Sequence, residues 1–368
     1  MNVLSTGDYS VSLTISIAQF ELLIGLKRKG VNMVIVAKFS DEIYNKLTEA
    51  GVICIKDYPN SKVDFEYVSR VKKYLAEYKI DIIHAFDGKA LRNVNIAVKN
   101  SPIKLITYMG STSIHWHDPS AYFTYLSPRI DKIICNSDYV YRHVKNQLFW
   151  GKKNKAVKIF KGYNPEWFTN VTPIDFKKYN IDTNTTIVCL AANYLKVKGI
   201  EYFIEASNYI EKDTKISFVL IGDMRAQNKQ INELINKSKN KEKIYALGFQ
   251  ADAVAFFKSI DIYVQTSNRE GFGRAISEAM CSKKPVVMTD AGGCTELIDE
   301  NSGIVVQKKN PKAIAEGIMQ LVNDKKLRES MGQNAYDRIS TVYHIEKTID
   351  ETLELYKSLY KEIQESKN

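Results

Sequence analysis

The chain has 368 residues, of which 45% are hydrophobic, so it is long enough for two domains that each have an ordinary core. No run approaches the ~18 to 20 apolar residues that a membrane-spanning helix needs. The sequence starts directly in a predicted strand at Asn2, without a charged or apolar leader, so a cytoplasmic protein is expected.

The positive charge is concentrated in the first half. Residues 1–165 hold 24 Lys and Arg against 14 Asp and Glu, which accounts for the whole formal net charge of +10. Clusters such as Lys27–Lys29 and Lys152–Lys155 favour an anionic surface, above all a membrane to which the protein would bind peripherally. The alternative is that they are solvated helix faces. No nucleic-acid-binding signature occurs, and nucleic acid is not an expected partner.

The cysteines argue against a metal site. There are five of them, scattered through apolar segments without metal-ligand spacing. Such a pattern is typical of reduced core residues in a cytosolic protein. No metal is therefore expected.

Short β-rich runs alternate with helical periods through the first half. Strands are predicted at 2–5, 31–37, 52–55, 81–85, 103–108 and 132–136. Because most of them are followed by a candidate helix, the pattern predicts a parallel, doubly wound sheet. The first predicted strand leads into a turn over Ser5–Ser10, which contains Gly7, and then into a helix over Val11–Lys29.

Three titratable residues, His115, His117 and Asp118, fall within four positions after a predicted strand. Ligands bind beyond the carboxyl ends of strands in open α/β sheets, so these residues are a candidate catalytic group in which Asp118 orients an imidazole ring. The alternative is structural, because Asp118-Pro119 is a favourable helix start and either histidine could be an ordinary hydrogen-bonding neighbour.

The alternation lapses between Phe160 and Thr183. A run containing Pro165 and Pro173 predicts a linker over 163–182, between a domain at 1–162 and one at 183–342. Strands are then predicted at 186–191, 216–221, 244–247, 261–265, 286–288 and 303–306. The final segment, 343–368, contains a long amphipathic helix.

The stretch Asn268–Met280 holds two carboxylates, Glu270 and Glu278, around the glycine-flanked corner Gly271–Gly273. The corner joins a predicted strand to a predicted helix. Backbone N–H groups at a helix start lack internal partners and the helix dipole is positive there, which suits a diphosphate. Glu278 lies one turn into the helix and could accept hydrogen bonds from a ribose. The alternative is a solvated helix residue.

This stretch resembles the E-x7-E signature region of the retaining glycosyltransferases of family 4. Further motifs follow in the family's order: Lys198-Gly199, Leu247–Gln250, Pro285–Gly293, Glu296–Asp299 and Asn301–Val306. The resemblance is close over about half of the chain and extends to the other half in layout. It implies a GT-B architecture, with two facing Rossmann-like α/β domains, a nucleotide-sugar site in the C-terminal one and a last helix that returns to the first domain.

The resemblance also implies roles for individual residues. Glu270 is expected to hold hydroxyl groups of the donor sugar, Glu278 the ribose, and Lys198 the donor diphosphate. Further donor contacts are expected from Asn193, Gly271, Phe272, Gly273, Gly7, Gly248 and Phe249.

The chain departs from the family pattern at three positions. Asn193 stands where arginine is common, and Gly7 stands alone where relatives often carry paired glycines. Met109 occupies the place of a frequent histidine, so that function is expected of His115 or His117.

The expected reaction moves a sugar from a nucleotide-diphosphate sugar to a glycan or lipid-linked acceptor, with retention of anomeric configuration. The sequence has no Asp-x-Asp motif, and neither a metal nor a cofactor besides the donor is expected. A basic first half fits an acceptor at the cytoplasmic face of a membrane, as in lipopolysaccharide, O-antigen or capsule assembly. The alternatives are a GT-B-type sugar phosphorylase or epimerase, and a catalytically silent sugar-nucleotide-binding subunit.

Overall fold

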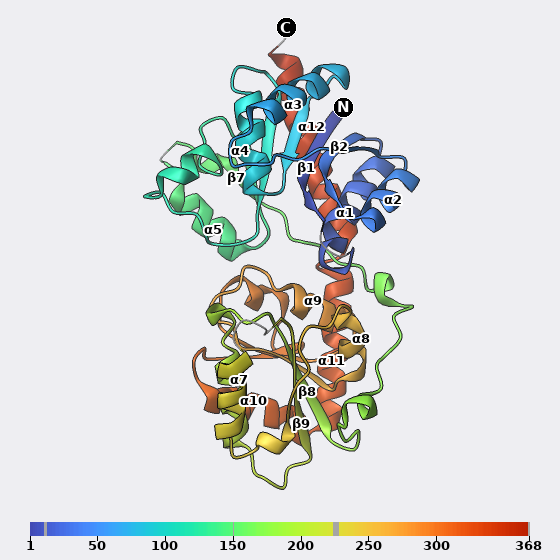
Figure 1. Cartoon of the computed structure of the whole chain (residues 1–368), viewed down its shortest axis with the longest axis vertical. Helices are drawn as coiled ribbons and strands as arrows, with labels where there is room; N and C mark the ends of the chain where they lie inside the picture. The colour runs from blue at the N-terminus through green and yellow to red at the C-terminus, as the bar shows by residue number, and fades with distance from the viewer. Residues whose placement is uncertain (11–12, 150, 224–227, 367–368) are drawn as a thin grey trace. The chain divides into compact units, whose positions relative to one another are not determined.

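The computed structural model describes residues 1–10, 13–149, 151–223 and 228–366. The chain divides into two compact units (Figure 1). The first unit contains residues 1–162 together with the C-terminal residues from Ile345 onward, and the second contains Tyr163–His344. Within the described residues, no helix combines the length and the apolar character needed to cross a membrane.

The first unit is built on a parallel sheet with the strand order β3-β2-β1-β4-β5-β6-β7. Its strands are β1 (Asn2–Tyr9), β2 (Asn32–Phe39), β3 (Ile53–Lys56), β4 (Ile82–Ala85), β5 (Lys104–Met109), β6 (Lys132–Cys135) and β7 (Ala156–Lys158). Its helices are α1 (Leu13–Arg28), α2 (Asp41–Glu49), α3 (Phe65–Glu77), α4 (Gly88–Ala97), α5 (Asp138–Gln147) and α12 (Ile345–Glu365). The strands carry near-continuous apolar runs because helices cover both faces of the sheet.

The second unit repeats this plan with the strand order β10-β9-β8-β11-β12-β13. Its strands are β8 (Thr186–Ala191), β9 (Ile216–Ile221), β10 (Ile244–Ala246), β11 (Ile262–Gln265), β12 (Val286–Thr289) and β13 (Gly303–Val306). Its helices are α6 (Ile200–Ala206), α7 (Asn228–Lys237), α8 (Ala253–Ser259), α9 (Arg274–Cys281), α10 (Pro311–Asn323) and α11 (Lys325–Thr341). In both sheets the order reverses beside the first strand, and ligands bind at such switch points.

The expected doubly wound parallel sheets are therefore confirmed, with two differences in detail. The predicted turn over Ser5–Ser10 is largely strand, because β1 continues as far as Tyr9 and pairs there with Phe39 of β2. The short strand β7 was not predicted, since its three residues carry too little pattern to stand out from a loop.

The segment 163–182, expected to be a linker, packs against helix α8 of the second unit. Lys258 Nζ donates hydrogen bonds to the carbonyl oxygens of Thr169 and Val171, at 2.9 and 2.7 Å. The ring of Phe176 meets that of Phe256 edge to face, with centroids 6.0 Å apart. Since these contacts are all with α8, the segment is part of the second unit.

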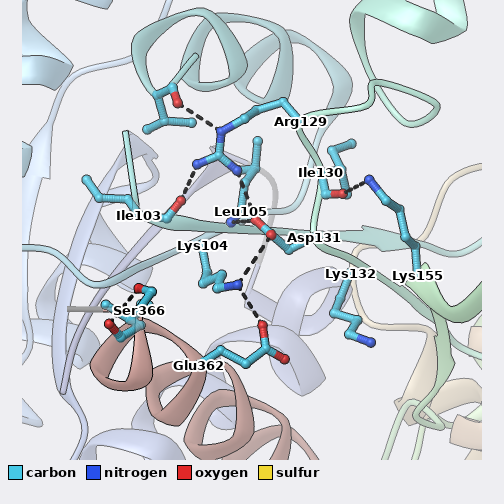
Figure 2. Close-up of polar contacts among 12 residues, drawn as sticks. Ile103, Lys104, Leu105, Arg129, Ile130, Asp131, Lys132, Lys155, Glu362 and Ser366 are labelled. Carbon is cyan, nitrogen blue, oxygen red and sulfur yellow. Dashed lines mark hydrogen bonds and ion pairs between the residues drawn. The ribbon is translucent and has the colours of Figure 1, made fainter. Parts of the chain in front are cut away.

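Helix α12 is fastened to the first unit along its length (Figure 1, red). Arg28 pairs with Glu346 near the start of the helix, and Lys104 Nζ lies 2.6 Å from Glu362 Oε2 near its end. Figure 2 shows this second contact, where Lys104 bridges Asp131 and Glu362. These contacts make α12 part of the first unit.

A buried histidine forms the central contact of this helix. His84 of β4 is fully buried, and its Nδ1 lies 2.7 Å from the hydroxyl of Tyr356 on α12. Burial lowers the pKa of His84 from 6.5 to about 3, because the charged imidazolium would lose its hydration. The folded unit therefore holds this side chain neutral.

Because His84 is buried, we predict that the free energy of unfolding decreases in acid. His84 takes up a proton in the unfolded chain below about pH 6.5 but stays neutral in the folded state until about pH 3. Stability must therefore fall as the pH drops through this window, by up to about 1.4 kcal/mol per pH unit. We expect His84→Gln to flatten the pH dependence of urea unfolding between about pH 6.5 and 5, where carboxylates remain largely ionised.

The exposed His117 supplies the matched control. His117→Gln removes the same kind of side chain from an exposed position and should leave the slope of unfolding free energy against pH unchanged. Equal slopes for the native chain and His84→Gln would refute the assignment.

Candidate functional site

A recess of the second unit lies at the carboxyl ends of its central strands. It has a volume of about 890 Å³, its open mouth included. Its lining includes Ala191, Asn193, Leu195, Lys198, Gly222, Phe249, Gln250, Gln265, Glu270, Gly273, Arg274 and Glu278. Loops after β8 and β11 dominate this lining, and these two strands are neighbours at the switch point of the sheet.

Lys198 is held in place by the backbone around it. It ends a short 3-10 turn and is followed by Gly199, whose φ of +61° lies in the left-handed region. The hydroxyl of Thr266 donates to the carbonyl oxygens of Lys198 and Gly199, at 3.2 and 2.8 Å. A Cβ on Gly199 would lie 2.3 Å from the carbonyl oxygen of Thr266, so glycine is required for this approach.

Glu270 is fixed through its own backbone. Its N–H donates to the carbonyl oxygen of Ala291 at 2.7 Å, and its carbonyl accepts from the N–H of Gly293 at 3.0 Å. Its carboxylate Oε2 lies 2.6 Å from Lys198 Nζ, and both side chains are largely buried. The recess therefore holds a close, charge-assisted hydrogen bond whose two partners are both available to a polar ligand.

Behind Glu270 runs a chain of buried hydrogen bonds. The hydroxyl of Tyr263 donates to Gln265 Oε1 at 2.6 Å, and Gln265 Nε2 donates to the hydroxyl of Ser267 at 2.6 Å. Ser267 Oγ in turn lies 3.5 Å from Glu270 Oε2. All three residues are at most 3% exposed, so this chain orients the carboxylate from inside the unit.

Glu278 is a buried carboxylate rather than a solvated helix residue. It is only 1% exposed, although it lines the recess, and Arg274 Nη1 donates to its Oε1 at 3.0 Å. Burial disfavours the charge of Arg274, but the neighbouring Glu278 carboxylate raises the pKa of the guanidinium overall. The pair spans the first turn of α9, which begins at Arg274 directly after Gly273 and has no side-chain cap.

Of the remaining residues expected to contact the donor, some line the recess and others do not. Asn193, Phe249 and Gly273 line the recess, and Asn193 Oδ1 also accepts from the N–H of Asp223 at 2.9 Å. The side chain of Phe272, in contrast, is buried at 3% exposure and packs on Tyr343, with ring centroids 5.7 Å apart. Phe272 therefore supports the corner from within the core.

Three expected glycine contacts lie outside the recess lining. Gly271 belongs to the corner itself, and Gly248 accepts through its carbonyl oxygen from the N–H of Gly222 at 2.8 Å. Gly7 lies in the first unit, inside β1, where it pairs with Ala37. It is thus a strand residue, because β1 extends through the position where a turn was expected.

His115, His117 and Asp118 also lie in the first unit, in the loop after β5. The two imidazole rings stack with centroids 5.3 Å apart, and His143 of α5 meets His115 edge to face. Hydrogen bonds from the hydroxyl and N–H of Ser120 lower the pKa of Asp118, which caps the 3-10 turn Pro119–Phe123. Asp118 therefore has the structural role that its sequence context allowed.

Sequence reasoning assigned no role to two residues of the recess, Arg274 and Gln265. Arg274 precedes Glu278 by four positions, and this helical spacing could have indicated the ion pair. Gln265 is a polar side chain in an otherwise apolar strand, which was a usable signal for a buried hydrogen-bonded position. Among the residues described, no group of three His, Cys, Asp or Glu side chains is arranged to hold a metal ion.

Two family profiles match the chain, one in each half. Residues 19–166 match the profile described as Glycosyltransferase Family 4, and residues 171–338 match that of Glycosyl transferases group 1. The two matches follow the division into units closely.

Individual relatives agree with these profiles. The chain is 29% identical over 296 residues to an uncharacterized glycosyltransferase of Methanocaldococcus jannaschii, a match that covers 78% of each chain. It is 35% identical over 161 residues to N,N'-diacetylbacillosaminyl-diphospho-undecaprenol alpha-1,3-N-acetylgalactosaminyltransferase of Campylobacter jejuni. This second match covers 44% of the present chain and 41% of that enzyme.

Solved structures share the fold over nearly the whole chain. A glycosyltransferase from Rickettsia africae superposes with a TM-score of 0.83 at 23% identity, covering 98% of both chains. Anabaena HepE in complex with UDP superposes with a TM-score of 0.79 at 19% identity, covering 97% of this chain and all of that one. Two Rossmann-like units and both family profiles thus lead to one conclusion: the chain belongs to glycosyltransferase family 4, with the GT-B fold.

Proposed function

We propose that the protein is a retaining, metal-independent glycosyltransferase that moves a sugar from a nucleotide-diphosphate sugar to a glycan or lipid-linked acceptor. Cell-surface polysaccharide synthesis, of lipopolysaccharide, O-antigen or capsule, is the process that we propose for it. The observation that carries the proposal is the recess of the second unit, in which Lys198 and Glu270 form a 2.6 Å ion pair close to the start of α9.

Lys198 and Glu270 can each exchange this ion pair for a contact with a polar ligand. Without a ligand, the ammonium of Lys198 and the carboxylate of Glu270 satisfy one another. A donor diphosphate would compete for Lys198 as a stronger anion, and Glu270 would then be free to accept hydrogen bonds from hydroxyl groups of the sugar. Glu270 is proposed to orient the transferred sugar, with the chain from Tyr263 to Ser267 holding its carboxylate.

Departure of the diphosphate would be stabilised by charges that are already in position. Lys198 supplies an ammonium, and the N–H groups at the start of α9 add the positive end of the helix dipole. Glu278, held by Arg274, is proposed to accept hydrogen bonds from the ribose. Retention would follow from attack by the acceptor on the face that the leaving group vacates.

A lipid-linked acceptor and a uridine nucleotide are the substrates to test first. The name of the Campylobacter relative describes transfer to a diphospho-undecaprenol-linked sugar, and Anabaena HepE has been solved with UDP. The excess of Lys and Arg in the first half suits an acceptor that carries phosphate groups. On these grounds we extend both substrate classes to this chain.

Removing the carboxylate of Glu278 should weaken nucleotide binding only because a contact with the ribose is lost. We expect Glu278→Gln to lose about 1–3 kcal/mol of binding free energy for the preferred nucleotide among UDP, GDP and ADP. Its affinity for inorganic pyrophosphate, which has no ribose, should stay unchanged. Calorimetric titration of both ligands checks this. A parallel loss for pyrophosphate would place Glu278 at the phosphates and contradict the assignment.

Removing the ammonium of Lys198 should weaken both ligands alike. Lys198→Met is expected to cost about 1.5–3 kcal/mol for the nucleotide and for pyrophosphate, because it removes a charge-assisted hydrogen bond to phosphate. Lys196→Met is the matched control, since Lys196 is exposed in the same 3-10 turn but does not line the recess. If both variants lost affinity equally, general charge rather than a specific contact would be the cause.

Neutralising Glu270 should separate binding from turnover. Glu270→Gln removes the anion that competes for Lys198, so UDP affinity should be retained or increase. The rate of sugar transfer should fall about 10²–10³-fold, as expected when a group that acts on the reacting sugar is lost. Calorimetry with UDP and a radiolabelled transfer assay supply the two readouts. An unchanged transfer rate would contradict the role of Glu270.

The same assays separate the alternatives. A sugar phosphorylase or epimerase would turn over its donor without a glycan acceptor. A catalytically silent subunit would bind the nucleotide sugar and transfer it to no acceptor, in the native chain as well as in Glu270→Gln.

A further inference from the structure

The first unit carries a group of exposed and half-buried aromatic and lysine side chains that the donor site does not use. We define this aromatic–lysine surface as Trp116, Tyr122, Phe149, Lys152 and Lys155. Trp116 is 60% exposed and Phe149 is 61% exposed, which is unusual for such large apolar groups when they occur together. The residues come from the loop after β5, the turn Pro119–Phe123 and the segment that follows α5.

The exposed aromatic residues are held in position. The hydroxyl of Tyr122 donates to the carbonyl oxygen of Trp116 at 2.8 Å, and the N–H of Trp116 donates to Gln147 Oε1 at 2.9 Å. The ring centroids of Tyr122 and Phe149 lie 6.0 Å apart. These contacts join the backbone of Trp116 to Tyr122 and to the end of α5, so the exposed Trp116 lies next to the ring pair of Tyr122 and Phe149.

A recess of about 510 Å³ opens between these residues. Its walls include Tyr122 and Phe149, its apolar lining includes Leu126 and Leu148, and both Lys152 and Lys155 border it. An apolar recess bordered by ammonium groups matches a molecule that has an anionic head and an apolar body.

The positive charge at this recess is concentrated. Lys155 donates to the carbonyl oxygen of Pro128 and to that of Ile130. Figure 2 shows the second contact, with Arg129 and Lys132 in the same part of the unit. Burial lowers the pKa of Lys155, and the neighbouring charge of Lys152 lowers it further. Asp131 is already paired with Arg129 at 2.9 Å. An anion bound at this point would relieve the repulsion among the cations.

We propose that the aromatic–lysine surface docks the protein on a bilayer that contains anionic lipids. Trp116 and Phe149 would enter the boundary between headgroups and acyl chains, where amphipathic and aromatic side chains are favoured. Lys152 and Lys155 would lie against the headgroup phosphates. The leucine-lined recess favours an acyl chain over a soluble polyanion, because a polyanion has no apolar body to bury there.

The proposal concerns the first unit alone and does not depend on the transfer reaction. The donor recess belongs to the second unit, so UDP affinity reports that this unit is intact in a variant, and a native urea-unfolding curve reports that the first unit is folded. If transfer does take place at a lipid-linked acceptor, this surface would bring the enzyme to it.

Vesicle flotation with the full chain tests the proposal. The native protein should bind phosphatidylcholine vesicles that contain phosphatidylglycerol and should bind vesicles of phosphatidylcholine alone far more weakly. Trp116→Ala combined with Phe149→Ala should lower the partition coefficient at least ten-fold. Lys152→Glu alone should lower it at least about five-fold, the effect of one lysine at an anionic surface. UDP affinity should stay at the native value in every variant.

Matched controls come from another part of the same unit. Phe65 is 74% exposed at the start of α3, and Lys72 is exposed on the same helix. Phe65→Ala and Lys72→Glu should leave vesicle binding unchanged, although they remove the same kinds of side chain.

Three results would overturn the proposal. They are no binding of the native chain to anionic vesicles, native binding by the Trp116→Ala/Phe149→Ala variant, and loss of binding in the Phe65 and Lys72 variants instead. Competition by heparin or RNA that persists in the aromatic variant would identify a general polyanion surface, and this outcome would also refute lipid docking.

Discussion

The ion pair between Lys198 and Glu270 is the interaction on which the candidate site depends. Its partners lie 72 positions apart in the chain and meet because β8 and β11 are adjacent in the sheet. The order of a doubly wound sheet reverses at this pair of strands, so the two loops that follow them diverge and leave a recess between them. A cation and a carboxylate that meet at such a point can separate again when a polar ligand offers better partners.

The backbone around the pair determines how accurately it is placed. Gly199 allows the lysine turn to contact the end of β11, and Thr266 closes this contact with two hydrogen bonds. On the other side, Glu270 is bonded through its N–H to Ala291 and through its carbonyl oxygen to Gly293. Such contacts limit the motion of both side chains to their own rotamers, which is the preorganisation that an electrostatic site requires. The buried Gln265 and Ser267 extend the same constraint to the carboxylate itself.

The first unit uses the same architecture for different purposes. One face of its sheet packs on an apolar core, and the other face accepts α12 through buried apolar side chains such as Ile349 and Leu359 and through the contact between His84 and Tyr356. Ion pairs lie at both ends of α12. At exposed positions such pairs contribute little to the free energy of folding. With the helix and the core accounted for, the exposed aromatic residues around Trp116 remain as a feature that folding alone does not explain.

The sequence by itself determined the class of fold, the strands of both sheets except β7, and the family, because alternation and ordered motifs are local properties of the chain. It also predicted Lys198, Glu270 and Glu278 as candidate site residues, since the Lys198-Gly199 motif and the glycine corner between the two glutamates are each formed by consecutive residues. Only the tertiary structure excluded a solvated position for Glu278, because burial depends on which distant segments cover a helix. The same holds for Phe272, whose side chain packs on Tyr343 in the core, and for Gly7, which lies inside β1 because that strand pairs with β2 as far as Tyr9. The roles of Arg274 and Gln265 likewise required the folded chain, since a polar side chain gains a function there only from partners that other elements bring within hydrogen-bonding distance.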